Sequence, residues 1–541
     1  MLFSKLAGKC KSSWLSLAGR FRQHEHSATT RATTRVAAPA TATATNTVPG
    51  ILFVLPYDLL ELIATVFFQR REAVKVLCVN SQFHHAFSRI VWHSLFIDDT
   101  VFTDIPAAPW KNYGHLVRVM RFEYYLERAE VDAELFPNLI ELRLSCSQLL
   151  NSNIKRNQLR KLRRLNLVSP WNRWTRSDAV KYVDAVQRWM QHSNCSLHVN
   201  WEIEATAGPR QNNMDAIDCI LSTIGREGIT NHTFSITLCM DHPVILTQLP
   251  LLADSLTKMY VGRSAPGFNC FLSNNSSSSN SNDDDANLIF PCLKSISIDG
   301  LALLRSESRR RVSNITPNQL PSLEELSLRT NQDTLDPGWF ADIFEYTWST
   351  LTTAAFYCCC SVTDFQTAIS HTPNLLHLSL LECAFTLDVS ILATQTPHLK
   401  DLSLGSRLAI DLGSAQYQQS QRSLTALRRL HLSYDYGTES GVFVTRNALQ
   451  FITRVAPGLA CIRFDDFRGI SNSDLDAVRG TVNPAVRSLD VDAPRYDLDF
   501  TTVQSMMALF PNLTLLDIKG KKSVYKTKSK LRQKYPKLAI F

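Results

Sequence analysis

The chain has 541 residues, of which 45% are hydrophobic and 20% charged, and its formal net charge is +8. This length exceeds what one compact core accommodates, so several domains or an elongated repeat array are expected. The composition excludes a chain that is disordered throughout.

The positive charge is concentrated at the two ends of the chain. Residues 1–49 contain seven Lys or Arg residues and the single acid Glu25, whereas residues 520–541 contain eight and no acid. The total of +8, less +6 and +8 for the two ends, leaves −6 for residues 50–519. We therefore expect two basic tails and a mildly acidic folded core that does not bind nucleic acid.

The first 49 residues allow two interpretations. Apolar and basic residues alternate in an acid-poor, Ser/Thr/Ala-rich setting, which is similar to a mitochondrial presequence. The alternative is a disordered basic tail, because the Thr/Ala tract at 37–47 has little to bury.

The cysteines indicate the cellular compartment, and the hydropathy indicates whether a segment could span a membrane. Thirteen cysteines occur at irregular spacing without paired C-x-x-C units, which predicts reduced thiols in a cytoplasmic or nuclear protein and no metal site. No run of about 18 apolar residues occurs, so no membrane span is expected.

Residues 55–97 carry apolar side chains at helical spacing, and the first of three short helices is expected to open after Pro56. A unit of about 45 residues is marginal alone and needs a neighbour to pack on. The apolar positions form three sets, one for each helix: Leu59, Leu60 and Ile63; Val74, Leu77 and Cys78; and Phe83, Phe87, Ile90 and Val91.

From residue 117 onward, an apolar residue is followed three and five positions later by two more. From residue 293 the copies recur at steps of 24 to 32 residues, close to the period of leucine-rich repeats with a few insertions. Clear copies begin at Leu139, Leu162, Leu293, Leu323, Leu375, Leu399, Leu427, Leu459, Val486 and Leu513, and weaker ones at Val117, Leu256 and Leu351.

This pattern predicts an α/β leucine-rich-repeat solenoid (horseshoe) over residues 98–519. In each short strand the last two apolar residues point into the array, and the residue between them faces outward. Residues 171–228 show helical periodicity with degenerate strands, and the Ser/Asn/Asp-rich residues 273–287 are predicted to form a disordered insert. Helical returns are expected at 364–371, 387–395, 446–455, 474–481 and 502–509.

The helical unit at 50–97 resembles an F-box, the segment that docks on the Skp-family adaptor of cullin-RING ubiquitin ligases. The resemblance rests on Leu55-Pro56, Asp58-Leu59-Leu60, Ile63, Val79 with Phe83, and Trp92 with Leu95. An F-box followed by repeats is similar to the F-box/leucine-rich-repeat proteins common in fungi. The adaptor-facing surface that this resemblance implies is Leu55, Pro56, Leu59, Leu60, Ile63, Leu77, Val79 and Phe83.

By this resemblance, the chain is expected to be the substrate-recognition subunit of an SCF-type ubiquitin ligase, acting in ubiquitin-dependent protein degradation. It would bind the adaptor and, through it, the cullin, as a monomer within the complex. One alternative is an adaptor-independent repeat scaffold for protein–protein interaction, in which the helical unit only caps the repeats.

A candidate substrate site lies on the outward strand positions, because Tyr and Arg are enriched in binding hot spots. A solvated face without a single ligand is the alternative. Phosphate-binding, metalloprotease and nucleophile motifs do not occur in the sequence, so neither an enzyme nor a cofactor is expected. The candidate substrate-binding residues are Arg429, His431, Tyr434, Tyr436, Arg463, Asp465 and Asp490.

Overall fold

A computed structural model gives the fold. The chain divides into two units, residues 1–66 and 67–541, and all described residues belong to the second. The expected tail at 1–49, the first two helices of the F-box-like unit and the insert at 273–287 lie outside the described residues. The structure describes residues 81–98, 107–123, 126, 131–151, 159–168, 175–191, 197–205, 219–220, 222–223, 232–240, 252–264, 289–299, 316–329, 343–357, 361–405, 407–412, 424–433, 442–443, 446–494, 496, 498–521 and 523–541.

Seventeen strands of the described residues form one parallel sheet, in which each strand pairs with the next one along the chain. The strands are β1 (Ser94–Ile97), β2 (Val119–Phe122), β3 (Glu141–Ser145), β4 (Arg164–Val168), β5 (His198–Ala205), β6 (His232–Met240), β7 (Leu256–Ser264), β8 (Ser295–Asp299), β9 (Glu325–Arg329), β10 (Thr353–Tyr357), β11 (His377–Leu381), β13 (Asp401–Gly405), β15 (Arg429–Ser433), β17 (Cys461–Phe464), β19 (Ser488–Ala493), β20 (Leu515–Gly520) and β21 (Ala539–Ile540).

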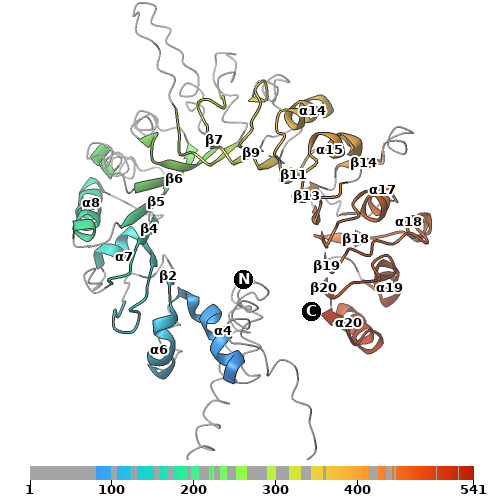
Figure 1. Cartoon of the computed structure of the whole chain (residues 1–541), viewed down its shortest axis with the longest axis horizontal. Coiled ribbons are helices and arrows are strands. Elements are labelled where there is room, and N and C mark those ends of the chain that lie inside the picture. Colours follow the sequence, from blue (N-terminus) through green and yellow to red (C-terminus); the bar gives the residue numbers. More distant parts are fainter. Residues whose placement is uncertain are drawn as a thin grey trace, which may run out of the picture. The chain divides into compact units, whose positions relative to one another are not determined.

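Where the structure describes a helix between two strands of this sheet, the helix lies on one side of the strands (Figure 1). Two small parallel pairs, β12 (Thr386–Asp388) with β14 (Ala409–Asp411) and β16 (Val442–Phe443) with β18 (Phe467–Gly469), form between strands and helices. The helices are α4 (Ser81–His93), α6 (Ala107–Tyr113), α7 (Cys146–Asn151), α8 (Arg176–Gln191), α14 (Val362–Ser370), α15 (Val389–Gln395), α17 (Arg446–Gln450), α18 (Asn472–Ala477), α19 (Phe500–Ala508) and α20 (Ser523–Lys534), with a 3-10 turn, η2 (Gly114–Leu116), and a π turn, η5 (Phe451–Val455).

The predicted repeat is confirmed in each of the thirteen copies. Every copy forms a strand, and its three apolar side chains are buried, except that Leu513 is half-buried. Burying a pair of aliphatic side chains contributes about 1.5–3 kcal/mol for each member. A strand cannot bury this pair alone, so the stacking of neighbouring repeats stabilises the fold. The protein is therefore a leucine-rich-repeat solenoid.

The array begins earlier than the sequence indicated. Trp92, Leu95 and Ile97 follow the same apolar spacing and are buried, and β1 pairs with β2 in register. This strand lies inside the range 50–97 that we assigned to the F-box-like unit. Helix α4 covers the third helix expected there, with Phe87 and Val91 buried.

The five helical returns begin near the expected residues, and polar side chains cap α14, α15, α18 and α19. Ser361 accepts a hydrogen bond from the backbone N–H of Asp364, whose carboxylate in turn accepts from the N–H of Ser361. Asp499 accepts from the N–H of Thr502 at the start of α19. Each cap contributes about 1 kcal/mol by satisfying an otherwise unpaired donor.

We call the first apolar residue of each copy its lead residue. In each Pro-Asn-Leu sequence, the asparagine that precedes the lead residue ties neighbouring repeats together. The side-chain amide donates to a backbone carbonyl of the preceding repeat, which satisfies an acceptor that the turn leaves unpaired. These bonds are Asn138 Nδ2 to His115 O (2.7 Å), Asn374 Nδ2 to Ser349 O (2.7 Å) and Asn512 Nδ2 to Pro484 O (2.9 Å).

An arginine directly after the lead residue forms ties in the opposite direction, to the following repeat. Its guanidinium donates to a carbonyl in that repeat's turn, so Arg118 and Arg487 bond the same pairs of turns that Asn138 and Asn512 join. These bonds are Arg118 Nη1 to Asn138 O (3.2 Å), Arg428 Nη1 to Gly458 O (2.9 Å) and Arg487 Nη1 to Asn512 O (3.2 Å).

The segment 520–541, which the sequence indicates only as a basic tail, contains a helix and a strand. Strand β21 pairs with β20 and thereby extends the sheet. On α20, Val524, Thr527 and Leu531 are buried, and Thr527 Oγ1 donates to the carbonyl of Leu498 at 2.9 Å. This segment is part of the repeat array.

Candidate functional site

The residue between the two buried aliphatics of each strand points away from the core. We call the surface formed by these residues and their outward neighbours on the same strands the polar face. On β13, β15, β17 and β19 the strand register aligns Ser403, His431, Arg463 and Asp490 side by side. A second row aligns Asp401, Arg429, Cys461 and Ser488.

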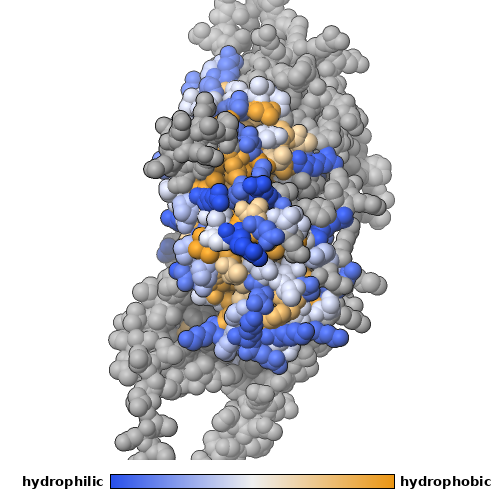
Figure 2. Space-filling model, turned by 90° about the vertical axis from the view of Figure 1, so that its right-hand side faces the viewer, coloured by the Kyte–Doolittle hydropathy of each residue, from blue (hydrophilic) through white to orange (hydrophobic). Residues whose placement is uncertain are grey.

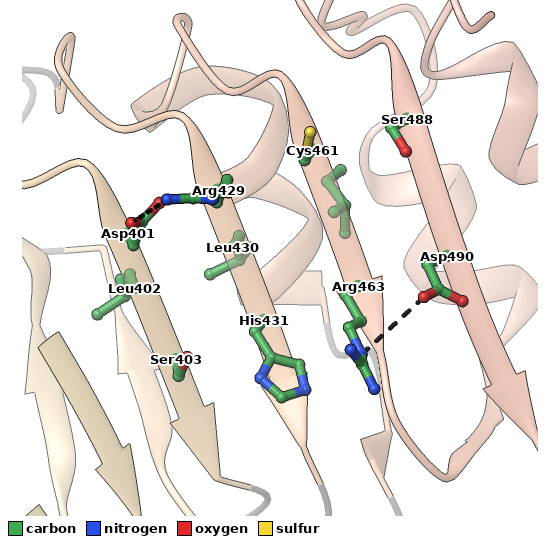
Figure 3. Close-up of a pocket in the computed structure, with 11 residues that line it drawn as sticks. Asp401, Leu402, Ser403, Arg429, Leu430, His431, Cys461, Arg463, Ser488 and Asp490 are labelled. Carbon is green, nitrogen blue, oxygen red and sulfur yellow. Dashed lines mark hydrogen bonds and ion pairs between the residues drawn. The ribbon is translucent and has the colours of Figure 1, made fainter. Parts of the chain in front are cut away.

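A shallow depression of about 410 Å³ lies on the polar face across these four strands (Figure 3). Its polar groups come from four different repeats, so only the stacked array brings them together. The depression is lined by Asp401, Leu402, Ser403, Arg429, Leu430, His431, Cys461, Ile462, Arg463, Ser488 and Asp490.

At one edge of the depression, Asp401 lies between the side chains of Arg429 and His377. Arg429 donates to both carboxylate oxygens, with Nη2 to Oδ2 at 2.6 Å, and His377 Nδ1 contacts the same carboxylate. Burial alone would raise the pKa of Asp401, but these hydrogen bonds and charges outweigh burial and lower it. Asp401 therefore stays ionised and orients the fork of Arg429 along the sheet.

Further along the face, Asp465 is held in the same way. His431 Nε2 lies 2.7 Å from Oδ2 of Asp465, and Arg463 Nε donates to Oδ1 at 2.8 Å. Burial would raise the pKa of Asp465, but hydrogen bonds with His431 and Arg463 lower it to about 2. Because Arg463 is half exposed, solvent screening limits what these pairs contribute to stability, and they also fix the side-chain positions.

Beyond Arg463 the polar face becomes acidic. Lys519 Nζ lies 3.2 Å from Asp517 Oδ2 and 3.5 Å from Asp490 Oδ1, so one ammonium is shared by two carboxylates. Burial raises the pKa of Asp492, and the nearby Asp465 and Asp490 raise it further against the attraction of Lys519. The ammonium of Lys519 therefore lies within this acidic end of the polar face.

Replacing Asp465 with Asn is expected to lower the free energy of unfolding by at most about 2 kcal/mol at neutral pH. The carboxylate's usual pKa is 3.8 and falls to about 2 in the folded chain. The contribution of the ionised Asp465 carboxylate to the free energy of unfolding is therefore complete above about pH 4 and is lost as the pH falls through 2. Urea unfolding of both proteins between pH 2 and 7 measures this difference.

The matched control for this prediction is Asp476→Asn. Asp476 pairs with Arg479 at 3.5 Å, but its side chain is 66% exposed. An exposed pair of this kind contributes about 0–1 kcal/mol. Equal losses for both variants, or a loss for Asp465→Asn that is as large at pH 2 as at pH 7, would show that the Asp465 ion pairs do not cause the loss of stability.

The structure brings together five of the seven predicted substrate-site residues. Arg429, His431, Arg463 and Asp490 line the depression, and Asp465 bonds to two of them. Tyr434 and Tyr436 lie outside the described residues.

The adaptor-facing residues Leu55, Pro56, Leu59, Leu60, Ile63, Leu77 and Val79 also lie outside the described residues. Phe83 falls within α4, and its side chain is not described.

Sequence reasoning left several residues out of the site, among them His377, Asp401, Cys461 and Lys519. Asp401 and His377 occupy outward positions of the predicted strands, so aligning the repeats by their lead residues would have placed Asp401 beside Arg429 and His377 beside Asp401. Lys519 follows the last aliphatic residue of its copy, where the pattern defines no position.

Within the described residues, His, Cys, Asp and Glu side chains do not gather in groups of three or more that could hold a metal ion. No described helix combines the length and the apolar character that crossing a bilayer requires.

The sequence matches no known family model and no curated protein. Among solved structures, the chain is similar to the TLR13–ssRNA13 complex, with 13% identity and a TM-score of 0.32, over 78% of this chain and 56% of that one. It is also similar to the Drosophila Toll–Spatzle complex, with 12% identity and a TM-score of 0.28, over 79% of this chain and 54% of that one. This chain thus spans little more than half the length of either.

Proposed function

We propose that this chain binds another protein through the polar face of β13, β15, β17 and β19, and that it works by binding rather than by catalysis. The observation that carries this proposal is the depression that four repeats form together. In it, Asp401 and Asp465 hold Arg429 and Arg463 in place before a partner arrives. Preorganised side chains bind with a smaller loss of conformational entropy.

We further propose that the bound protein is the substrate of an SCF-type ubiquitin ligase. The support is the F-box resemblance at residues 55–95, together with a helix at the place expected for the third F-box helix. In this arrangement the N-terminal unit docks on the Skp-family adaptor, and the repeats hold the target near the separately supplied catalytic module. The chain acts in the cytoplasm or nucleus.

Replacing Leu59 and Ile63 with Asp is expected to abolish co-purification with the adaptor, because two charges would enter an apolar helix-in-groove contact. The repeats, which lie elsewhere in the chain, should keep their thermal unfolding transition. Affinity purification from cells, scored for adaptor and for ubiquitinated proteins, measures the effect. Retention of every partner by this variant would favour the adaptor-independent scaffold.

The reciprocal variant replaces Arg429 and Arg463 with Ala. It is expected to keep the adaptor and to lose client proteins at least tenfold, because truncating hot-spot arginines costs roughly 2 kcal/mol or more each. Lys111→Ala with Lys400→Ala is the matched control, since both lysines are exposed and lie outside the depression. If the Arg429/Arg463 variant recovered as much client protein as the unmodified chain, the polar face would not be the binding site.

A further inference from the structure

Helix α20 carries a concentrated positive charge on a rigid support. Residues 521–537 include seven lysines and one arginine, and residues 520–541 contain no acid. The apolar side of α20 is already used, because Val524 and Leu531 are buried against the rest of the array. The basic side chains therefore occupy the remaining circumference of the helix.

Three of these lysines form one stripe. Lys526, Lys530 and Lys534 are exposed and spaced by four residues, so they lie on the same side of the helix at a rise of about 6 Å per step. Lys521 and Lys537 are exposed at either end of this segment. In Figure 2 the lower edge of the described surface, at the level of α20 in Figure 1, is largely hydrophilic.

The protein offers this stripe little compensating charge. Among the described residues, the nearby carboxylate of Asp517 pairs with Lys519, and Asp499 caps α19. Burial lowers the pKa of Lys528, and the repulsion of Arg532 and Lys519 lowers it further against the attraction of Asp517. Arg532 and Lys519 thus repel the charge of Lys528, and an anionic partner would relieve this repulsion.

An aromatic ring stands beside the stripe. Tyr525 is 68% exposed, and the ammonium of Lys528 lies 5.8 Å from its ring centroid. Leaving a large aromatic side chain in water forgoes burial that elsewhere stabilises the fold. Proteins that bind single strands without sequence preference combine such rings, on which bases stack, with lysines that contact the phosphates.

We propose that α20 binds single-stranded nucleic acid, with Lys526, Lys530 and Lys534 on the phosphates and Tyr525 stacked on a base. This surface is separate from the polar face proposed to bind protein. The acidic charge of residues 50–519 does not oppose the proposal, because α20 lies outside that range.

Two other anionic partners fit less well. An amphipathic helix that binds membranes inserts its apolar side into the lipid, whereas the apolar side of α20 is buried within the protein. An acidic peptide is recognised best by the planar fork of arginine, whereas α20 and its flanks present mainly lysine. Lysine is a compact point charge that suits a dense polyanion.

The test uses the full chain and two fluorescein-labelled oligonucleotides of about 15 residues, oligouridine and oligodeoxythymidine. Fluorescence anisotropy at several salt concentrations is expected to show binding that weakens steeply with salt. Lys526→Gln, Lys530→Gln and Lys534→Gln together are expected to weaken binding at least tenfold at low salt. They should also reduce the log–log salt slope by about 2, since each phosphate contact on a single strand contributes about 0.7.

A second variant and a matched control separate the contribution of base stacking from that of the lysine charges. Tyr525→Ala is expected to weaken binding roughly fivefold or more while leaving the salt slope unchanged, because stacking releases no counterions. Lys111→Gln, Lys258→Gln and Lys400→Gln remove the same charge from exposed positions elsewhere and should bind like the unmodified chain. All variants are compared at equal helical content by circular dichroism.

Three outcomes would overturn the proposal. One is the absence of oligonucleotide binding at low salt, and another is equal weakening by the α20 triple variant and the control triple variant. The third is stronger binding to vesicles containing phosphatidylserine, or to a polyglutamate peptide, than to either oligonucleotide. Loss of oligonucleotide binding with intact client and adaptor recovery would leave the proposed protein-binding function standing.

Discussion

Asn483→Asp is expected to lower the free energy of unfolding by about 3–5 kcal/mol at neutral pH, although the two side chains have nearly the same shape. Asn483 is 1% exposed, and its Nδ2 donates to the carbonyls of Ile452 at 2.7 Å and Ala456 at 2.9 Å. Its Oδ1 accepts from the N–H of Ala485 at 3.0 Å. An ionised carboxylate would face the two carbonyl oxygens with nothing to donate.

The sign of the pH dependence makes this prediction specific. A buried carboxyl facing carbonyl oxygens has a raised pKa, so the folded variant binds a proton that the unfolded chain releases above about pH 4. The loss of stability should therefore shrink as the pH falls towards 4. Urea unfolding between pH 4 and 8 measures the dependence.

Asn512→Asp supplies the matched control. Asn512 Nδ2 also donates to a backbone carbonyl of the preceding repeat, Pro484 O at 2.9 Å, but this hydrogen bond is exposed to solvent. Water can replace the lost bond and solvate the charge, so a loss below about 1 kcal/mol is expected. Equal losses at the two positions would show that burial is not what makes Asn483 sensitive.

Acidification from about pH 6.5 to pH 4 is expected to lower the stability of the β5–β6 region by about 3 kcal/mol through His232. His232 is 3% exposed; Trp201 Nε1 donates to its Nδ1 at 2.9 Å, and its Nε2 lies 3.2 Å from Met190 Sδ. Burial, with a smaller effect of His198, lowers the pKa of His232 from its usual 6.5 to about 4. Between these values the unfolded chain binds a proton that the folded chain does not.

Hydrogen exchange of the β5 and β6 amides across this pH range, corrected for the intrinsic exchange rate, measures the effect. His232→Gln keeps an acceptor for Trp201 and removes the titrating group, so the acid-dependent loss should disappear. His115→Gln, at an exposed position, should retain it. An acid-dependent loss of the same size in the His232→Gln protein would assign it to another group.

The sequence predicts the strand of a repeat where all three positions of the pattern, including the first, are apolar. Three apolar side chains at this fixed spacing, recurring along the chain, are typical of few folds besides the leucine-rich repeat. The thirteen strands and the outward residues of the polar face therefore followed from the sequence. Strand β6 lacked this signal because Asn231 stands three positions before its buried Phe234. Strand β1 was hidden because the same apolar residues, Trp92 and Leu95, also fit the F-box pattern.

Two features were harder to predict from the sequence: which residues a long side chain contacts, and a helix whose composition is mostly basic. The register placed Arg429 beside Asp401, but only the structure shows that Lys519 extends back to Asp490 on the neighbouring strand. Helix α20 was not predicted because its many lysines obscure the pattern of its buried side, which Val524, Thr527 and Leu531 form at steps of three and four residues.

The asparagine and arginine ties between turns have a mechanical consequence. Each tie joins a repeat only to its immediate neighbour, as Asn374 does to Ser349 and Arg428 to Gly458. Tension applied along the chain therefore loads these bonds one after another, starting from an end. A single molecule pulled at its termini should unzip in a series of small steps, each the length of about one repeat.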